Sequence, residues 1–143
     1  MRKKLVILGR GTAGCLATAH FAKWLNNYEL EWHFDPSIPT QSVGEGASLS
    51  FPRNLFSSLT FTHGNLINVN GTYKTGIAKE GWGKTGEYFF HDFPPPFISY
   101  HFNAVMLQDY VFSLLKNRVK IVEHNITSDR IDADMIKIGR AHV

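Results

Sequence analysis

The chain has 143 residues, of which 43% are hydrophobic and 19% are charged, so its size and composition fit one globular domain and argue against a disordered or fibrous class. The formal net charge is +3. Three positive charges, at residues 2–4, precede the first apolar run, and we interpret them as a solvated leader, so we expect no nucleic-acid partner. The single cysteine, Cys15, excludes an internal disulfide and favours a reducing compartment, which predicts a cytoplasmic protein.

The N-terminus begins with basic residues and a short apolar run, yet it does not fit a signal peptide. The apolar core is too short, and Arg10 interrupts it. No run approaches the roughly 20 apolar residues of a membrane span. We therefore expect neither secretion nor a membrane partner.

The first predicted elements form a strand–helix–strand unit. Leu5–Leu8 predicts a parallel strand that is buried on both faces. Apolar residues then recur at helical spacing over residues 13–25, and Leu30–Phe34 predicts a second strand. Such a unit crosses over in the right-handed sense.

A glycine-rich turn joins this first strand to the helix. Gly9 would form the tight turn, Gly11 would let the backbone approach a pyrophosphate, and Gly14 would let the helix pack closely on the strand. The free N–H groups at the start of the helix, at Thr12 and Ala13, would face the phosphates. This arrangement predicts a dinucleotide cofactor without specifying which one.

An acidic residue, Asp35, ends the second predicted strand, 21 positions after Gly14. An acid at this place can hydrogen-bond a ribose hydroxyl of the cofactor. The alternative is a carboxylate that merely ends a strand before a proline.

The middle of the chain alternates loops with short elements. After a loop over residues 37–50, Pro52 suits the first turn of a short helix. Residues 72–80 alternate like a strand, and on one face of it Gly76 and Ala78 would leave room around the amine of Lys74.

The last predicted elements are a helix and a third strand. Asn103 is a suitable N-cap for a helix whose apolar stripe runs from Ala104 to Leu115 and includes Leu114. Residues 119–122 predict the third strand. The fold class is thus α/β, an incomplete Rossmann-like domain with a long insertion between strands 2 and 3, and we expect no strand on the far side of the first one.

Five segments, in the same order, resemble the flavin-dependent tryptophan halogenases. They are Gly9–Gly14, which resembles the FAD-binding turn; Ser42-Val43-Gly44-Glu45-Gly46, which resembles the loop across the flavin; Gly71-Thr72-Tyr73-Lys74 followed by Gly81-Trp82, which resembles the segment with the catalytic lysine; Phe89-Phe90-His91-Asp92-Phe93, which resembles a stretch of the substrate pocket; and Tyr100-His101-Phe102-Asn103-Ala104, which resembles the start of a later helix. The resemblance covers most of residues 5 to about 125.

The resemblance implies a cofactor, a reaction and a set of partners. The cofactor would be FAD, used as FADH2 that a separate flavin reductase supplies, and its contacts would include Val43, Gly44 and Glu45. Reduced flavin, O2 and halide would give hypohalous acid, which Lys74 would activate beside an electron-rich, indole-like aromatic substrate. Lys79 does not match the family's lysine.

The sequence leaves the roles of several candidate site residues open. Lys74 could act as a neutral amine that forms a haloamine or as an ammonium that donates a hydrogen bond to hypohalous acid. His91 and Phe93 would contact the substrate, whereas the alternative for His91 is a core histidine in an aromatic cluster. Glu45 orders the flavin loop or faces water. The histidines show no metal-ligand spacing, so we expect no metal site.

The sequence also departs from the family. Only a proline-rich connector joins Phe93 to Tyr100, which argues against tryptophan itself as the substrate. The family's later motifs are absent, so residues 1–137 are expected to be a truncated, partial FAD-binding halogenase domain without activity of its own. Residues 138–143 match the translation of a common sequencing adapter and are interpreted as a non-native tail. The alternatives are another FAD-dependent monooxygenase or oxidoreductase and a non-catalytic nucleotide-binding module.

Overall fold

The computed structural model describes residues 2–43, 45–125 and 131–139. Its main element is a four-stranded sheet with the order β7-β2-β1-β8, in which all neighbouring strands are parallel. The strands are β1 (Lys3–Leu8), β2 (Tyr28–Phe34), β7 (Lys120–Glu123) and β8 (Met135–Ile138). The predicted α/β class and parallel sheet are confirmed.

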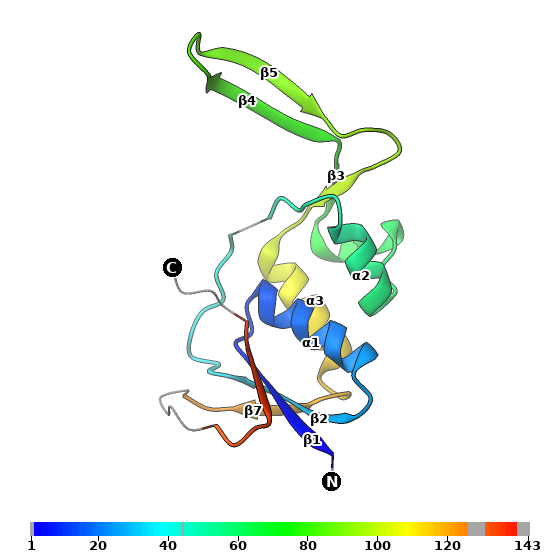
Figure 1. Cartoon of the computed structure of the whole chain (residues 1–143), viewed down its shortest axis with the longest axis vertical. Helices are drawn as coiled ribbons and strands as arrows, with labels where there is room; N and C mark the ends of the chain where they lie inside the picture. The colour runs from blue at the N-terminus through cyan, green and yellow to red at the C-terminus, as the bar shows by residue number, and fades with distance from the viewer. Residues whose placement is uncertain (1, 44, 126–130, 140–143) are drawn as a thin grey trace.

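Two helices, α1 (Thr12–Trp24) and α3 (Ala104–Leu115), lie side by side next to this sheet (Figure 1). The α1 helix follows β1 through the glycine-rich turn. The α3 helix leads into β7 and begins at Asn103, whose side chain accepts a hydrogen bond of 2.9 Å from the Met106 amide, as an N-cap does. The predicted helix boundaries and this cap are confirmed to within one residue.

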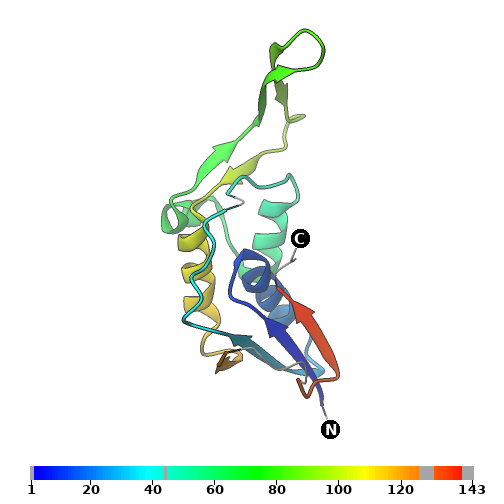
Figure 2. The same ribbon diagram turned by 90° about the vertical axis from the view of Figure 1, so that its left-hand side faces the viewer.

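The strand β8 corrects the expectation that nothing lies beyond β1. Residues Leu5 to Leu8 pair in parallel with Met135 to Ile138, and Figure 2 shows the two strands next to each other. The strand β8 has only four residues, and all four are exposed. Its sequence therefore lacks the continuous apolar run by which a buried strand is predicted. Residues 140–143 lie outside the described residues, so the origin of the 138–143 segment stays a prediction.

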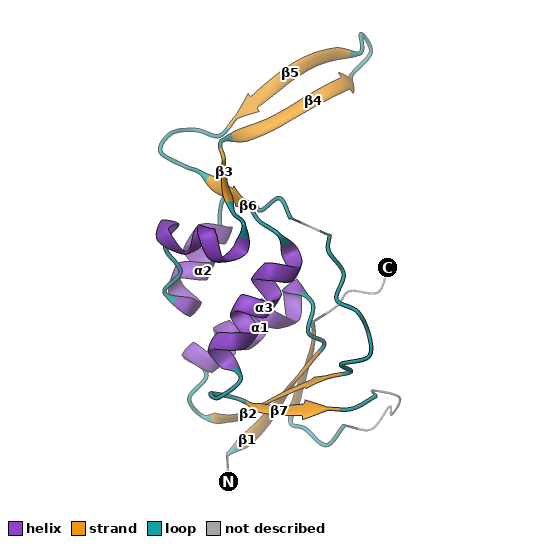
Figure 3. Ribbon diagram, turned by 180° about the vertical axis from the view of Figure 1, so that it is seen from behind, coloured by secondary structure: helices purple, strands orange, loops and turns teal. Residues whose placement is uncertain are grey.

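A second group of elements lies between β2 and β7 in the sequence. It contains α2 (Phe51–Leu59), the 3-10 helix η1 (His63–Val69) and a small antiparallel sheet of β3 (Thr72–Lys74) with β6 (Ser99–His101). Pro52 lies in the first turn of α2, as predicted. A long hairpin, β4 (Gly76–Trp82) with β5 (Glu87–Asp92), projects from this group away from the main sheet (Figure 3).

The prediction of one continuous strand over residues 72–80 is wrong. The strand stops at Thr75, whose carbonyl accepts a 2.7 Å hydrogen bond from the Phe93 amide. The part before Thr75 pairs with β6, whereas the part after it pairs with β5. The space beside Gly76 is filled by the Phe90 ring, so this glycine does not leave room around Lys74. Alternation of residue types does not reveal a change of pairing partner.

The core forms between the helices and one face of the main sheet. Leu5, Val6 and Ile7 of β1 are completely buried, as expected for a strand flanked on both sides. Trp32 of β2 packs its ring against Phe112 of α3, at 5.7 Å between ring centroids.

One predicted core position, Leu114, is wrong, and Trp24, an apolar residue of α1, also lies outside the core. Leu114 of α3 is 39% exposed and Trp24 of α1 is 58% exposed. The buried side of α1 is instead formed by smaller residues, namely Gly14, Cys15, Thr18 and Ala19. Small side chains on this side allow the helix to approach its neighbours closely.

The opposite face of β2 carries a buried polar cluster. Glu31 accepts a 2.7 Å hydrogen bond from the Lys120 ammonium and lies 2.8 Å from Nε2 of His33. Nδ1 of His33 lies 3.1 Å from Nε2 of His124. These contacts join β2 to β7 and to the residue that follows it, and the hydrogen bond from Lys120, together with that from His33, holds the pKa of Glu31 below its ordinary value.

Candidate functional site

The glycine-rich turn has the geometry that a phosphate-binding turn requires. Gly9 has a φ of +93°, a conformation that favours glycine, and its amide donates a 2.8 Å hydrogen bond to the His33 carbonyl. A Cβ on Gly14 would overlap the Gly9 carbonyl oxygen, whereas a Cβ on Gly11 would meet no atom within 4 Å. Gly14 therefore sets the close approach of helix and turn, and Gly11 faces open space.

The start of α1 is open to an anion. Gly11 is the N-cap, so no side chain caps the helix, and the first turn contains no acidic residue. The N–H groups of Thr12 and Ala13 belong to the first turn, which has no intrahelical acceptors for them. Together with the positive end of the helix dipole, these groups fit a phosphate, and the residues present therefore fit a dinucleotide.

The α3 helix holds this turn in place from the side, which the sequence did not reveal. The Arg10 guanidinium makes a 2.6 Å ion pair with Asp109 and lies 4.2 Å from the centroid of the Phe112 ring. Both partners lie on α3. Arg10 thus ties the turn to the helix.

A second contact from α3 reaches the first residue of α1. The amide Nε2 of Gln108 donates a 3.0 Å hydrogen bond to Oγ1 of Thr12 and a 3.3 Å bond to the carbonyl of Gln41. The apolar stripe of α3 contained the signal for this residue, because Gln108 falls one position after buried Leu107 and three before buried Val111. A polar residue on a buried helix face requires partners.

The loop expected to cross the flavin is fixed by backbone pairing and one side chain. The Glu45 carbonyl accepts a hydrogen bond from the Phe102 amide, and the Ala47 amide donates one to the Tyr100 carbonyl. The Glu45 carboxylate accepts a 3.0 Å bond from the Ala104 amide, the first residue of α3. Of the two alternatives for Glu45, the structure therefore shows the one in which it orders the loop.

Of the other two residues of this loop, the structure describes Val43 but not Gly44. Val43 is 67% exposed and makes no core contact. Gly44 lies outside the described residues, so its predicted role stays a prediction.

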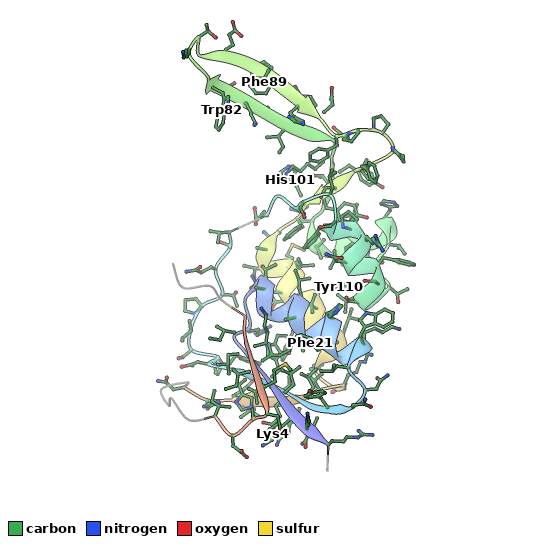
Figure 4. The ribbon with its side chains drawn as sticks, viewed as in Figure 1. Lys4, Phe21, Trp82, Phe89, His101 and Tyr110 are labelled. Carbon is green, nitrogen blue, oxygen red and sulfur yellow. The ribbon has the colours of Figure 1, made fainter. Side chains whose placement is uncertain are left out.

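Lys74 lies against this loop. Its Nζ donates a 3.2 Å hydrogen bond to the Ala47 carbonyl and lies 5.7 Å from the centroid of the Phe93 ring. His101, which Figure 4 shows at the base of the hairpin, lies next to Gly46 on the same loop. The structure thus brings together Lys74, Phe93 and the 45–47 segment, which lie far apart in the sequence.

His91 does not join this group. It lies opposite Ile77 in the hairpin and is exposed. The alternative in which His91 is a core histidine is therefore wrong, and contact with a substrate stays a prediction. Lys79 also lies on the hairpin, with its Nζ 4.7 Å from the centroid of the Trp82 ring.

The Asp35 carboxylate is engaged locally. Its Oδ1 accepts hydrogen bonds of 2.8 Å from the Ser37 amide and 2.6 Å from the Ser37 hydroxyl. These bonds lower the pKa of Asp35, so the carboxylate is ionised near neutral pH. Both bonds end on Oδ1, which leaves Oδ2 for another donor such as a ribose hydroxyl.

Cys15 is a packing residue. It is completely buried inside the first turn of α1, and burial raises the pKa of its thiol to about 12. A thiol in this state is neutral and unreactive near neutral pH.

The described residues contain neither a candidate metal site nor a helix that could span a membrane. Within residues 2–43, 45–125 and 131–139, no group of three His, Cys, Asp or Glu side chains has the geometry of a metal site. In the same part of the chain, no helix has the length and apolar character that crossing a membrane requires.

The parallel sheet and the glycine turn define a Rossmann-like fold. Over residues 4–142, the sequence matches the family model of tryptophan halogenase. The match covers nearly the whole chain, and the chain therefore belongs to the tryptophan halogenase family.

Solved structures of similar proteins agree with this fold. A tryptophan 6-halogenase from Streptomyces toxytricini superposes with a TM-score of 0.78 at 20% identity, covering 91% of this chain and 36% of that one. A flavin-dependent halogenase from Xanthomonas campestris gives 0.80 at 20% identity, covering 94% and 37%. A tryptophan halogenase from Shewanella frigidimarina gives 0.74 at 14% identity, covering 93% and 38%. The chain spans less than two fifths of the length of these relatives.

Proposed function

We propose that the chain is the N-terminal part of a flavin-dependent halogenase that modifies an electron-rich, indole-like aromatic compound. The proposal depends above all on one observation, which is that Nζ of Lys74, on β3, donates a hydrogen bond to the carbonyl of Ala47, directly after the loop that the family resemblance assigns to the flavin. Membership of the family supports the same activity. FAD is the proposed cofactor, and a separate reductase would supply it in reduced form.

The residues present suggest how FAD would be held. Gly9, Gly11 and Gly14 would shape the pyrophosphate site, and the N–H groups of Thr12 and Ala13 would bind its oxygens. The free Oδ2 of Asp35 would accept a hydrogen bond from a ribose hydroxyl. Residues 43–45 would lie along the flavin.

When bound and reduced, FAD supplies the hypohalous acid from O2 and halide. Lys74 would then hold and polarise this oxidant at its ammonium group. Its two partners, the carbonyl of Ala47 and the ring of Phe93, would fix the position of Nζ beside the oxidant. The same Phe93 ring would line the approach of the aromatic substrate.

The experiment compares two lysines in the protein extended to the length of its relatives. In a halogenation assay with FADH2, O2, halide and indole-type substrates, we expect Lys74→Ala to lose at least about 100-fold in rate, a typical effect of removing a proton-donating side chain. Lys79→Ala should retain near-wild-type rates. Retained halogenation by Lys74→Ala would contradict the role of this lysine, and hydroxylation without halide would favour another flavin-dependent monooxygenase.

We further propose that the 143-residue chain is inactive alone, since it spans less than two fifths of its relatives' length.

A further inference from the structure

Gln108 is a buried polar side chain that packing does not explain. Gln108 is only 1% exposed, on the side of α3 that faces α1. An amide at such a position costs stability unless all its groups are hydrogen-bonded. The Oε1 atom of Gln108 is buried and has no partner among the described residues. A nonpolar side chain of similar length would avoid this cost.

The orientation of the Gln108 amide follows from its neighbours. The Gln41 carbonyl lies 3.3 Å from the terminal nitrogen, and a carbonyl only accepts. The NH2 group therefore faces Gln41, and the same group lies 3.0 Å from Oγ1 of Thr12. It follows that Thr12 Oγ1 accepts a hydrogen bond from Gln108.

This orientation determines what the Thr12 hydroxyl can do. A hydroxyl has one hydrogen, and accepting from Gln108 leaves that hydrogen free to donate. Thr12 is the first residue of α1, next to Gly11, whose surroundings are open. The helix N-terminus there favours an anion through its dipole.

We propose that Gln108 is a positioning residue for the cofactor pyrophosphate. By donating to Oγ1 of Thr12, it directs the Thr12 hydroxyl hydrogen toward the phosphate oxygens at the start of α1. The inference rests on the proposed FAD site and adds a residue from α3 to it. The unpartnered Oε1 is the structural cost of keeping an amide at this place.

The test is a double-mutant cycle on FAD affinity in the 143-residue chain, measured by titration of flavin fluorescence. We expect Gln108→Met, which keeps the length of the side chain but cannot donate, to weaken FAD binding about 10-fold, the size of one lost hydrogen bond to a charged group. Thr12→Val should give a loss of at least the same size. The double variant should bind no more weakly than Thr12→Val alone, because Gln108 acts through Thr12.

The thermal midpoint without FAD separates positioning from structural support. It should not fall in Gln108→Met, since the change removes an unpartnered buried oxygen. Gln108→Asn, whose amide is one methylene shorter, gives a second variant, and we expect the same loss of affinity from it.

Three results would contradict the proposal in different ways. Additive losses in the double variant would show that Gln108 does not act through Thr12. Wild-type affinity in both Gln108→Met and Gln108→Asn would overturn the inference and leave the proposed function intact. Failure of the wild-type chain to bind FAD would overturn the FAD site of this chain and the inference with it.

Discussion

Gly11 and Gly14 lie three residues apart in the same turn and have opposite surroundings. A side chain on Gly14 would overlap backbone atoms of Gly9, which cannot move without opening the turn. A side chain on Gly11 would point into open space, and the φ of Gly11 is an ordinary −67°. Gly14 is therefore required for packing, whereas the absence of a side chain at Gly11 leaves the space beside it open.

This difference gives a prediction at the scale of single residues. Gly14→Ala should lower the free energy of unfolding by about 3 kcal/mol, at the upper end of the cost of overpacking, because the obstruction is backbone. Gly11→Ala should leave stability unchanged within about 0.5 kcal/mol and weaken FAD binding. Chemical denaturation measures the first effect and an FAD titration the second. Equal stability of the two variants would contradict this account of the turn.

At the scale of elements, the polar cluster between β2 and β7 ties two neighbouring strands together. Glu31 lies between Lys120 and His33, and the hydrogen bond from Lys120 is the main reason that the pKa of Glu31 falls below its ordinary 4.5. The same contact raises the pKa of Lys120 above 10.5. A carboxyl group with a lowered pKa stabilises the fold above its unfolded-state pKa, and this contribution is lost as the pH falls through the folded-state value.

Glu31→Gln should therefore destabilise the chain most near pH 7 and progressively less below about pH 4.5. The thermal midpoint of the wild type should approach that of the variant as the acid range is entered. Above pH 10.5, deprotonation of Lys120 should also reduce the difference. Glu80→Gln, which removes the same charge from an exposed position of β4, serves as the control. A difference between wild type and Glu31→Gln that does not change with pH would contradict the prediction.

At the scale of the whole molecule, the β4–β5 hairpin projects from the body (Figure 1). Large apolar side chains on this hairpin are exposed. Trp82 and Tyr88 are each 63% exposed, and Phe90 is 46% exposed. A hairpin with apolar side chains and unpaired edges favours association.

We expect the 143-residue chain to self-associate through this hairpin. Trp82→Ser combined with Tyr88→Ser should shift the chain toward monomer, as measured by light scattering at increasing concentration, without lowering its thermal midpoint. Trp24→Ser provides the control, because Trp24 is also exposed, at 58%, but lies on α1. A monomeric wild-type chain at all concentrations would contradict the prediction.

The local parts of this molecule were predictable because each depends on neighbouring residues. The glycine turn, the Asn103 cap and the apolar runs of β1 and β2 all depend on backbone conformation or on periodicity within a few residues. The family resemblance depends on the same local segments. It predicts that Lys74 is the catalytic lysine, and that role stays a prediction.

Local sequence patterns could not predict the contacts between segments that are far apart in the sequence. The pairing of β8 with β1, the change of partner at Thr75, the contact of Lys74 with Ala47 and the contact of Gln108 with Thr12 each join residues whose meeting depends on the packing of the intervening chain. Local pattern indicates that Gln108 is polar on an apolar helix face, but not which group it meets. Burial and hydrogen bonding across the fold place that amide against Thr12, next to the glycine-rich turn, because α3 packs against α1.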